Sequence, residues 1–327
     1  MKVILLLAGK GVRFLPLTER LPKPLIRVAG ASVLEHILRS IARLEVSEII
    51  LITSHLSAQI EAFMAQHYRG VYRIIRQDKL DGTGGAVYAA RDHIDGPVLV
   101  LFGDTIFEAD LSCLKERPHE NVIWTRHVED FQRFGIVQTG EAGNMAVIVE
   151  KPPVDVGRNA NIGLYYLADH QALWSALERV MKGASINGEY YFTYALNHMV
   201  KNGHSIRVAN VNAWHDCGTL SALIETNQQL LLQETKSQTL QFEGVTVVPP
   251  VWIEEGAILR DCQIGPNVTI EAGCNIVSSK IKHSLVGRNC VLRNVELTQS
   301  LVGPGESLSD VIVERSIVAH GEVKQPR

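Results

Sequence analysis

Short repeated units near the C-terminus constrain the fold of this 327-residue chain more than any other feature. Beyond Val245, short apolar residues recur among Gly, Asn, Glu and Asp without a helical period. The units that align by eye are IGPNVTI from Ile264, VGRNCVL from Val286, VGPGESL from Val302 and, more weakly, IEEGAIL from Ile253. Repeats of this hexapeptide type predict a parallel β-helix, because each coil buries its aliphatic residues only by stacking on the next. We expect a small solenoid of roughly four coils over residues 245–318.

The first third of the chain alternates strands with helices. Lys2–Leu7 is a continuous apolar run, typical of a parallel strand covered on both faces. Residues 32–44 have apolar positions at helical spacing, and Ser32 with Glu35 forms a capping box at the start. Further strands are expected at 48–53, 71–77 and 97–104, and helices from about 57 and 84. This order predicts a Rossmann-like, mostly parallel sheet, which binds ligands at the carboxyl ends of its strands.

A less regular mixture follows residue 121. We expect strands near 121–127, 134–139, 145–150, 162–167 and 205–211, and helices near 169–182, 190–201 and 219–234. These elements are interpreted as an insertion that completes the same α/β domain. The predicted domains are therefore residues 1–237 and residues 245–318.

Composition narrows the class of partner. A net charge of -3 argues against a general nucleic-acid binder, whereas a local basic cluster still suits a small anion. The five cysteines are odd in number and lack CxxC spacing, so neither a disulfide framework nor a zinc site is indicated. The N-terminal apolar stretch is too short for a signal peptide, and no window reaches the length of a membrane span. We therefore expect a cytoplasmic protein without nucleic-acid or membrane partners.

The segment Leu5–Leu25, LLLAGKGVRFLPLTERLPKPL, places glycines and cations directly after the first strand. We call it the signature segment. A glycine-rich turn lets backbone N–H groups approach phosphate oxygens, because no Cβ intervenes. Arg13 and Lys23 would add charge-assisted contacts. A dinucleotide fingerprint starting at Gly9 fails at Phe14, and no GxxxxGK[ST] occurs, so the segment binds phosphate by another scheme.

This segment resembles the signature of the sugar-1-phosphate nucleotidylyltransferases, LxxGxGxRLxPLTxxxPKP. The further blocks that match, in the family's order, are QDKLDGTGGAV, LFGDTIF, FGIVQ, VEKP, NIGLYYL and WHDCGT, and together they cover residues 3–219. Within this family, the chain resembles the glucose-1-phosphate thymidylyltransferases in their long form. It implies an α/β nucleotidyltransferase domain followed by a small left-handed β-helix, which is common in the long members.

The resemblance implies a reaction and the residues that perform it. An oxygen of a sugar 1-phosphate attacks the α-phosphorus of a nucleoside triphosphate in line, pyrophosphate leaves, and an NDP-sugar remains. Because both reactants are polyanions, positioning and electrostatic stabilisation carry the catalysis. Arg13 would hold the triphosphate and the leaving pyrophosphate, Lys23 would lie near the reacting phosphates, and Lys151 would bind the phosphate of the sugar. Asp104 and Asp216 would together hold Mg²⁺.

The same resemblance implies the recognition residues. The residues that it assigns to nucleotide binding are Ala8, Gly9, Gly11, Gln77, Gly82 and Thr83. Gln77 offers an amide donor and acceptor to the O4 and N3–H edge that thymine and uracil share, so dTTP and UTP are favoured. Those assigned to the sugar, glucose 1-phosphate or a close relative, are Gly135, Glu150 and Asn161.

Two positions depart from the family pattern. Val12 replaces the usual threonine, so one hydroxyl contact is missing, and one net hydrogen bond contributes roughly 0.5 to 1.5 kcal/mol. Tyr194 replaces the aspartate of a Thr-Asp-Ala motif, which questions the detail of the sugar pocket and suggests an unusual sugar.

Two other functions stay open. One is a binding or regulatory subunit that has the same two domains but no catalytic activity. Such a subunit would be free to lose its phosphate-binding and metal-binding residues, whereas this sequence retains all of them. The other is a bifunctional enzyme whose β-helix also transfers an acyl group, with His283 as the candidate histidine. We also expect homo-oligomers formed through the β-helix, because stacked coils present flat faces.

Overall fold

The computed structural model describes residues 1–233 and 244–326, and the chain divides into two compact units. Unit 1 consists of residues 1–9 and 40–214, and unit 2 of residues 10–39 and 215–327. Most of the signature segment therefore belongs to the same unit as the C-terminal repeats. The expected end of the first domain, at residue 237, lies outside the described residues, so the division into 1–237 and 245–318 stays a prediction.

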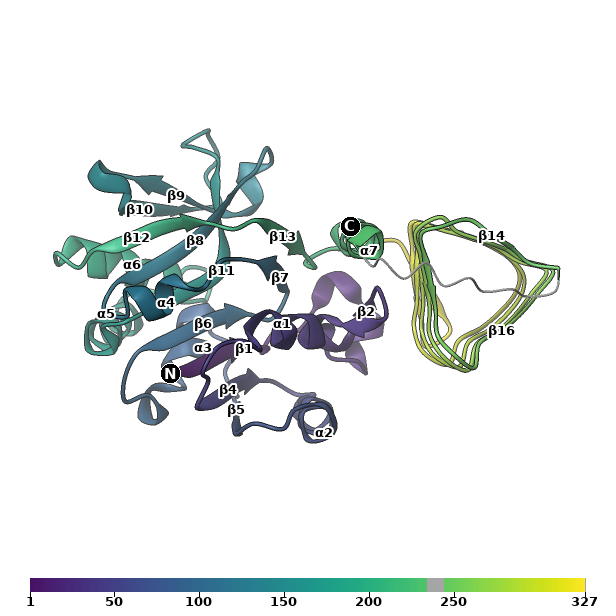
Figure 1. Ribbon diagram of the computed structural model, residues 1–327, viewed down its shortest axis with the longest axis horizontal. Coiled ribbons are helices and arrows are strands. Elements are labelled where there is room, and N and C mark those ends of the chain that lie inside the picture. The colour runs from purple at the N-terminus through teal and green to yellow at the C-terminus, as the bar shows by residue number, and fades with distance from the viewer. Residues whose placement is uncertain (234–243, 327) are drawn as a thin grey trace. The chain divides into compact units, whose positions relative to one another are not determined.

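A mixed sheet forms the centre of unit 1 (Figure 1). Its strand order is β10-β9-β11-β6-β1-β4-β5, and β8 joins it through β11 and carries β12. Strands β6, β1, β4 and β5 are parallel, whereas β11 runs antiparallel to β6. The strands are β1 (Lys2–Leu6), β4 (Glu48–Thr53), β5 (Tyr72–Arg76), β6 (Val98–Phe102), β8 (Asn121–His127), β9 (Gly135–Thr139), β10 (Met145–Glu150), β11 (Asn159–Leu167) and β12 (Ile206–Asn210). The expected α/β class is confirmed.

The helices follow the predicted order with small shifts at their ends. They are α1 (Val33–Ile41), α2 (Ser57–His67), α3 (Thr83–Tyr88), α5 (His170–Lys182), α6 (Phe192–Lys201) and α7 (Leu220–Gln233). Several short elements were not predicted: β2 (Arg27–Val28), β3 (Ala31–Ser32), β7 (Thr105–Glu108), α4 (Cys113–Glu116) and β13 (Ala213–Asp216). Each has two to four residues, too few for a period of either kind to stand out in the sequence.

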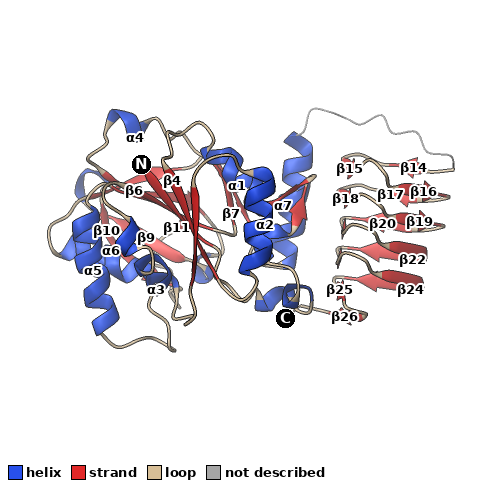
Figure 2. Cartoon of the chain, turned by 90° about the horizontal axis from the view of Figure 1, so that it is seen from below, coloured by secondary structure: helices blue, strands red, loops and turns tan. Residues whose placement is uncertain are grey.

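The core of unit 1 explains why its parallel strands are apolar throughout. Ile4 and Val100 point toward a cluster that includes Val87, Leu177 and Leu196, from helices α3, α5 and α6. The neighbouring strand residue Val3 is equally buried, so both faces of the central strands are covered, as a continuous apolar run predicts. Figure 2 shows these helices beside the strands of the sheet.

Helix α1 begins with half of the predicted capping box. The backbone N–H of Glu35 donates to Oγ of Ser32 at 3.1 Å. The carboxylate of Glu35 does not reach back but pairs with Arg39 one turn later. The helix ends at Ile41, three residues before the end of the apolar pattern at residue 44.

Unit 2 contains a parallel β-helix, which Figure 1 shows end-on as a three-sided coil. The strands are β14 (Thr246–Val247), β15 (Val251–Ile253), β16 (Ile258–Arg260), β17 (Gln263–Ile264), β18 (Val268–Ile270), β19 (Asn275–Val277), β20 (Lys280–Lys282), β21 (Leu285–Val286), β22 (Val291–Thr298), β23 (Leu301–Val302), β24 (Ser307–Glu314), β25 (Ile317–Ala319) and β26 (Glu322–Lys324). Parallel pairing from coil to coil is consistent with the expected left-handed β-helix.

Three hexapeptides would give a coil of about 18 residues, and the coils of this β-helix are slightly shorter. Val251 pairs with Val268 and Leu285 with Leu301, so the repeat is 17 and then 16 residues long. Five strands of one face, β15, β18, β21, β23 and β25, stack in this way, and β26 folds back antiparallel on β25 to end the described solenoid. Aliphatic residues and Cys262, Cys274 and Cys290 fill its interior.

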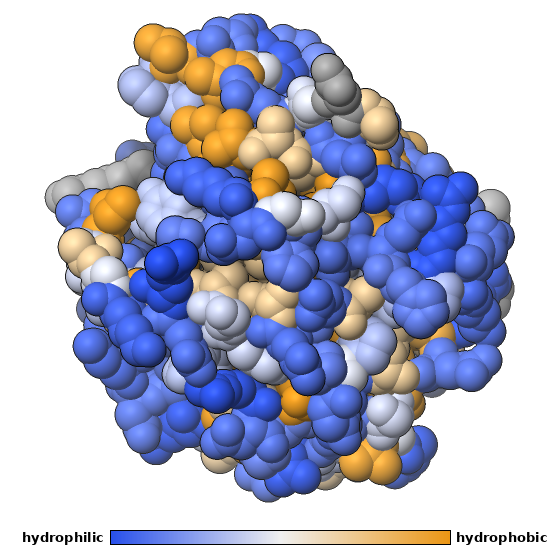
Figure 3. All heavy atoms as spheres, turned by 90° about the vertical axis from the view of Figure 1, so that its left-hand side faces the viewer, coloured by the Kyte–Doolittle hydropathy of each residue, from blue (hydrophilic) through white to orange (hydrophobic). Residues whose placement is uncertain are grey.

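The cysteines and one face of the surface show no special feature. None of the five cysteines forms a disulfide. Figure 3 shows one face of the molecule, which is mostly hydrophilic with small scattered apolar patches, as on ordinary protein surfaces. Among the described residues, the helices are all too short or too polar to cross a bilayer.

Candidate active site

Gln77 follows β5 at the carboxyl end of the sheet and is 8% exposed. Its Nε2 donates to Oδ1 of Asp81 at 2.9 Å and, more weakly, to the carbonyl of Gly82 at 3.4 Å. The donor half of this amide is therefore used inside the protein. Oε1 is the half suited to a ligand, and it can accept a hydrogen bond from an N–H group such as N3–H of a pyrimidine.

The glycines after Gln77 form a tight turn into α3. Gly82 has φ 96°, and a Cβ there would lie 2.6 Å from the carbonyl oxygen of Tyr190. A Cβ at Gly85 would lie 1.9 Å from Oδ1 of Asp81. The hydroxyl of Thr83 accepts a hydrogen bond from the N–H of Phe192 at 3.0 Å. Only glycine fits these two positions, and Thr83 joins the loop to the start of α6.

Glu150, the last residue of β10, is a mostly buried carboxylate. Its Oε1 accepts a 2.6 Å hydrogen bond from Oγ1 of Thr193 on α6. A Cβ at Gly135 would lie 2.9 Å from the same oxygen, so the glycine leaves room for the carboxylate. Burial raises the pKa of Glu150, while the hydrogen bond from Thr193 and the charge of Lys151 oppose that rise.

Asn161 lies at an irregular point of β11, and Lys151 directly follows the end of β10. The register of β11 against β8 shifts between Asn161 and Tyr165, a bulge that re-aims side chains. The side-chain oxygen of Asn161 accepts from the N–H of Gly163 at 3.1 Å, and its Nδ2 donates to the hydroxyl of Tyr165 at 2.5 Å. Lys151 has φ 43°, the left-handed region that a lysine seldom adopts, and its side chain is exposed. Strain of this kind clusters at functional sites.

Asp104 lies in the turn after β6, beside the end of β1. The N–H of Gly103 donates to the carbonyl of Leu6 at 2.9 Å, which ties this turn to the start of the signature segment. Ala8 and Gly9 follow in the same unit, and a Cβ at Gly9 would meet no atom within 4 Å. The half-buried carboxylate of Asp104 thus shares the carboxyl edge of the sheet with open backbone.

The rest of the signature segment, in unit 2, is a series of short 3₁₀ turns. Gly11 has φ 60°, and its carbonyl accepts a 2.8 Å hydrogen bond from the buried Thr18. Arg13 is exposed, and Nζ of Lys23 lies 5.8 Å from the centre of the Phe14 ring, a cation–π contact. Side chains in this segment are therefore braced locally, while Arg13 reaches solvent.

Asp216 ends β13 and is held by its own turn. Its Oδ1 accepts from the N–H of Gly218 at 2.7 Å, and its carbonyl accepts from the hydroxyl of Thr226 at 2.9 Å. Among the described residues, no group of three or more His, Cys, Asp and Glu side chains forms a metal site. Half-buried carboxylates such as Asp104 and Asp216 still fit a hard cation, since Mg²⁺ typically takes one or two carboxylates and completes its shell with phosphate and water oxygens.

Tyr194, the departure from the family pattern, is half-buried beside the core of unit 1. Its ring meets that of Tyr191 edge-on, with centroids 5.6 Å apart. Burial and then the charge of Glu150 raise the pKa of the Tyr194 phenol, which places the phenol in the electrostatic reach of that carboxylate. The charge of the predicted sugar-binding residue is therefore felt at the substituted position.

Some residues of this region were missed by sequence reasoning. They are Asp81, Tyr190 and Thr193. Asp81 is part of QDKLDGTGGAV, a block that matches the family, and Thr193 is part of GEYYFTYAL, the segment that contains Tyr194. Their roles depend on partners in other elements, which local spacing does not reveal.

A mostly parallel α/β sheet with glycine turns at the carboxyl ends of its strands is typical of nucleotide-binding domains. The family model described as nucleotidyl transferase matches residues 2–233, and the chain belongs to this family. The resemblance inferred from the motifs is thereby confirmed, and members of the family generally use a divalent metal ion.

Several relatives are similar over most of the chain. The bifunctional protein GlmU of Methanocaldococcus jannaschii is 32% identical over 260 residues, which are 79% of this chain and 61% of that protein. The UTP--glucose-1-phosphate uridylyltransferase AglF of Haloferax volcanii is 27% identical over 72% of this chain and 99% of its own. This chain thus spans about three fifths of the GlmU relatives that it matches.

Solved structures agree with the fold. A UDP-glucose pyrophosphorylase complexed with UDP-glucose has a TM-score of 0.64 at 20% identity, covering 71% of this chain and 99% of that chain. The UDP-glucose pyrophosphorylase of Acinetobacter baumannii has a TM-score of 0.60 at 21% identity and covers 72% of this chain. At this identity, the likeness supports the α/β architecture of the nucleotidyltransferase region.

Proposed function

We propose that this protein transfers a nucleotidyl group from a nucleoside triphosphate, dTTP or UTP favoured, to glucose 1-phosphate or a related sugar 1-phosphate, releasing pyrophosphate. The observation that carries the proposal is the presence, in one compact unit, of a base-reading amide at Gln77 and a buried hydroxyl acceptor at Glu150. A nucleotide and a sugar are the ligands that this pair of groups suits.

The amide of Gln77 defines how the base is read. Because its Nε2 already donates to Asp81, its Oε1 accepts N3–H of the pyrimidine, and backbone near Gly82 and Thr83 serves O4. The edge read in this way is common to thymine and uracil. The carboxylate of Glu150 accepts hydrogen bonds from sugar hydroxyls, with Asn161 and the space above Gly135 completing the sugar site.

The phosphates are assigned to backbone and cations. Ala8, Gly9 and Gly11 offer N–H groups, and Arg13 binds the triphosphate and then the leaving pyrophosphate. Lys23 stabilises the charge that develops on the reacting phosphates, and Lys151 binds the phosphate of the sugar. Asp104 and Asp216 would hold Mg²⁺, which supplies charge neutralisation to the phosphate oxygens.

Two further expectations belong to this proposal. Similarity to AglF and the UDP-glucose pyrophosphorylase supports the sugar-nucleotide class. We expect a cytoplasmic site of action, because nucleoside triphosphates are available there. The stacked coils of the β-helix support self-association of the chain through that region.

A second activity is favoured by one observation, that several relatives are named bifunctional proteins. The β-helix would then transfer an acyl group with His283 as the base. Its Nδ1 lies 2.9 Å from Nδ2 of Asn267 at a corner of the coil. Acyl-CoA consumption that disappears in His283→Ala, while pyrophosphate release survives, supports this activity; absence of any acyl-CoA turnover rejects it.

The decisive experiment for the main proposal is a pyrophosphate-release screen. Five nucleoside triphosphates are each combined with a panel of sugar 1-phosphates, with Mg²⁺ and again after chelation. We expect release with dTTP or UTP, dependent on the sugar and abolished by the chelator. Silence across the panel, together with no nucleotide binding by calorimetry, rejects the proposal.

A further inference from the structure

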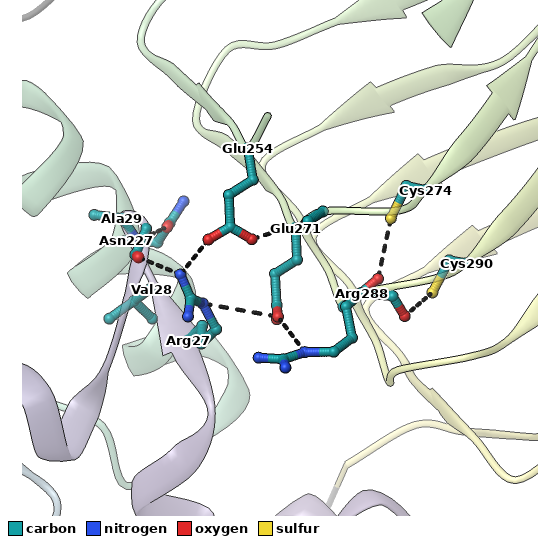
Figure 4. A network of polar contacts seen from close by, with 12 residues as sticks. Arg27, Val28, Ala29, Asn227, Glu254, Glu271, Cys274, Arg288 and Cys290 are labelled. Atoms are coloured by element: carbon teal, nitrogen blue, oxygen red, sulfur yellow. Dashed lines mark hydrogen bonds and ion pairs between the residues drawn. The ribbon is translucent and has the colours of Figure 1, made fainter. Parts of the chain in front are cut away.

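Arg27, two residues beyond the signature segment, forms ion pairs with two carboxylates of the β-helix (Figure 4). Its Nη2 lies 2.5 Å from Oε1 of Glu254, and its Nε lies 3.7 Å from Oε2 of Glu271. The three side chains are 19%, 29% and 11% exposed. At this burial, solvent and salt screen the attraction much less than at a surface pair.

The carboxylates have fixed positions of their own. Oε2 of Glu254 accepts from the N–H of Ala272 at 2.9 Å, and Oε2 of Glu271 lies 3.3 Å from Nε of Arg288 (Figure 4). The group therefore has two cations and two anions, each tied to backbone or to another charge. Burial raises the pKa of Glu271, and Arg27 and Arg288 oppose that rise. Removing Arg27 takes away the cation that pairs with Glu254 in a mostly buried place.

A second set of contacts lies beside the ion pairs. The fully buried Asn227, on α7, accepts through Oδ1 from the N–H of Ala29 at 2.9 Å and from the hydroxyl of Thr269 at 2.6 Å. Gly30 faces the indole of Trp252, which a Cβ would approach to 2.2 Å. One buried amide thus links the residues after Arg27 to a strand of the β-helix.

The signature segment is also held near its middle, at Leu17. A Cβ on Gly303 would lie 2.9 Å from Cδ1 of Leu17, and the 3₁₀ turn Leu17–Glu19 contacts β25. Between Leu17 and Arg27 the chain runs through the 3₁₀ turn Lys23–Leu25, closed by the N–H of Ile26 donating to the carbonyl of Lys23 at 3.1 Å. Proline at 22 and 24 stiffens this stretch further.

We propose that Arg27 is a positioning residue for nucleotidyl transfer: by pairing with Glu254 and Glu271 it fixes the signature segment on the β-helix and so holds Lys23 and Arg13 in place. This inference rests on the proposed function, because it concerns the placement of the same cations. It gives the β-helix a direct part in the chemistry of the phosphates. The amino acids proposed to bind the sugar belong to unit 1 and are not part of this linkage. A change at Arg27 should therefore leave the affinity for the sugar 1-phosphate unchanged.

The test compares Arg27→Gln and Arg27→Lys with the intact protein and with Arg39→Gln. Arg39 is a matched control, since it forms an exposed pair with Glu35 in the same unit and loses the same charge. We expect Arg27→Gln to lower kcat by about tenfold to a hundredfold, because small misplacements of catalytic groups have effects of this size. The KM for the nucleotide should rise, and the KM for the sugar 1-phosphate should stay the same. Arg27→Lys, which keeps the charge, should recover part of the loss.

Hydrogen exchange provides a readout that does not need activity. In Arg27→Gln, and more weakly in Arg27→Lys, amides of residues 12–26 should exchange faster, while amides of β1, β4 and β6 keep their protection. Unchanged exchange in residues 12–26 overturns the inference. A uniform loss of protection, or a lower kcat with every KM unchanged, indicates general destabilisation and overturns it as well.

The two proposals fail in different ways. An intact protein that releases no pyrophosphate with any substrate pair, while Arg27→Gln still loosens residues 12–26, refutes the enzyme function and leaves only the mechanical link. An active intact protein whose Arg27→Gln variant matches it in kcat and both KM values refutes the positioning role alone.

Discussion

The hydroxyl of Thr193 donates a 2.6 Å hydrogen bond to Oε1 of Glu150, a carboxylate that the fold otherwise buries. This bond fixes the acceptor proposed for the sugar. Thr193→Val keeps the shape of the side chain and removes the donor, so kcat/KM for the sugar 1-phosphate should fall about tenfold to a hundredfold. A hydrogen bond to a charged group contributes about 1.5 to 3 kcal/mol, which corresponds to that loss.

Thr193→Ser is the control for this change, because it retains the hydroxyl and loses only a methyl group. It should keep most of the activity. Steady-state kinetics in which Val and Ser variants behave alike would mean that packing of the methyl group, and not the hydrogen bond, matters at this position.

Glu150 also predicts a pH dependence of stability. Burial raises its pKa in the folded chain above the ordinary 4.5, so the folded state binds this proton more tightly than the unfolded state. The resulting stabilisation is fully present below pH 4.5 and is lost as the pH rises through the folded pKa. Glu150→Gln cannot ionise. The free energy of unfolding of the intact protein, relative to this variant, should therefore fall with rising pH across that window.

Urea unfolding at a series of pH values, without ligands, measures this difference. Above the window the difference should become constant. A difference that grows with pH would show that the charged form of Glu150 is stabilised by the fold, contrary to the effect of burial.

Replacing Val12 with the threonine that is usual in the family should strengthen nucleotide binding. Its side chain is 61% exposed, so the missing hydroxyl of the family leaves no buried group unsatisfied. Val12→Thr should add one hydrogen bond to the nucleotide and lower its KM, by at most about tenfold for 0.5 to 1.5 kcal/mol. Val12→Ala serves as the control, since it changes the side chain without adding a donor. An unchanged KM in Val12→Thr would place residue 12 away from the bound phosphates.

Gly30 tests the packing of unit 2 against Trp252. Gly30→Ala forces a Cβ into a backbone with φ 81° and onto the indole ring, at 2.2 Å. Gly305→Ala has nearly the same φ, 78°, and meets no atom within 4 Å. The free energy of unfolding of both variants should fall by about 1 kcal/mol, because alanine is strained in the left-handed region. That of Gly30→Ala should fall by about 1 to 3 kcal/mol more, because the added methyl group overpacks the site. Thermal unfolding of the two variants gives the comparison, and equal midpoints would contradict the predicted clash.

The sequence alone determined the class of each region. Apolar runs and helical spacing indicated most strands and helices of unit 1, because burial on a sheet or a helix imposes a period on the chain. The repeats beyond residue 245 indicated the β-helix for the same reason, although not the 16- and 17-residue coil. The signature segment and its companion motifs indicated the family, which the match over residues 2–233 confirmed.

Only the tertiary structure decided which groups meet. It showed that the amide nitrogen of Gln77 donates to Asp81 and that the hydroxyl of Thr193 donates to Glu150. It also showed that Arg27 pairs with Glu254, a residue 227 positions further along the chain. The last two contacts join elements brought together by folding, and the first forms within one loop, so no periodic pattern encodes any of them. The sequence therefore specified what chemistry the chain carries, while the packing of distant elements decided which atoms are free to perform it.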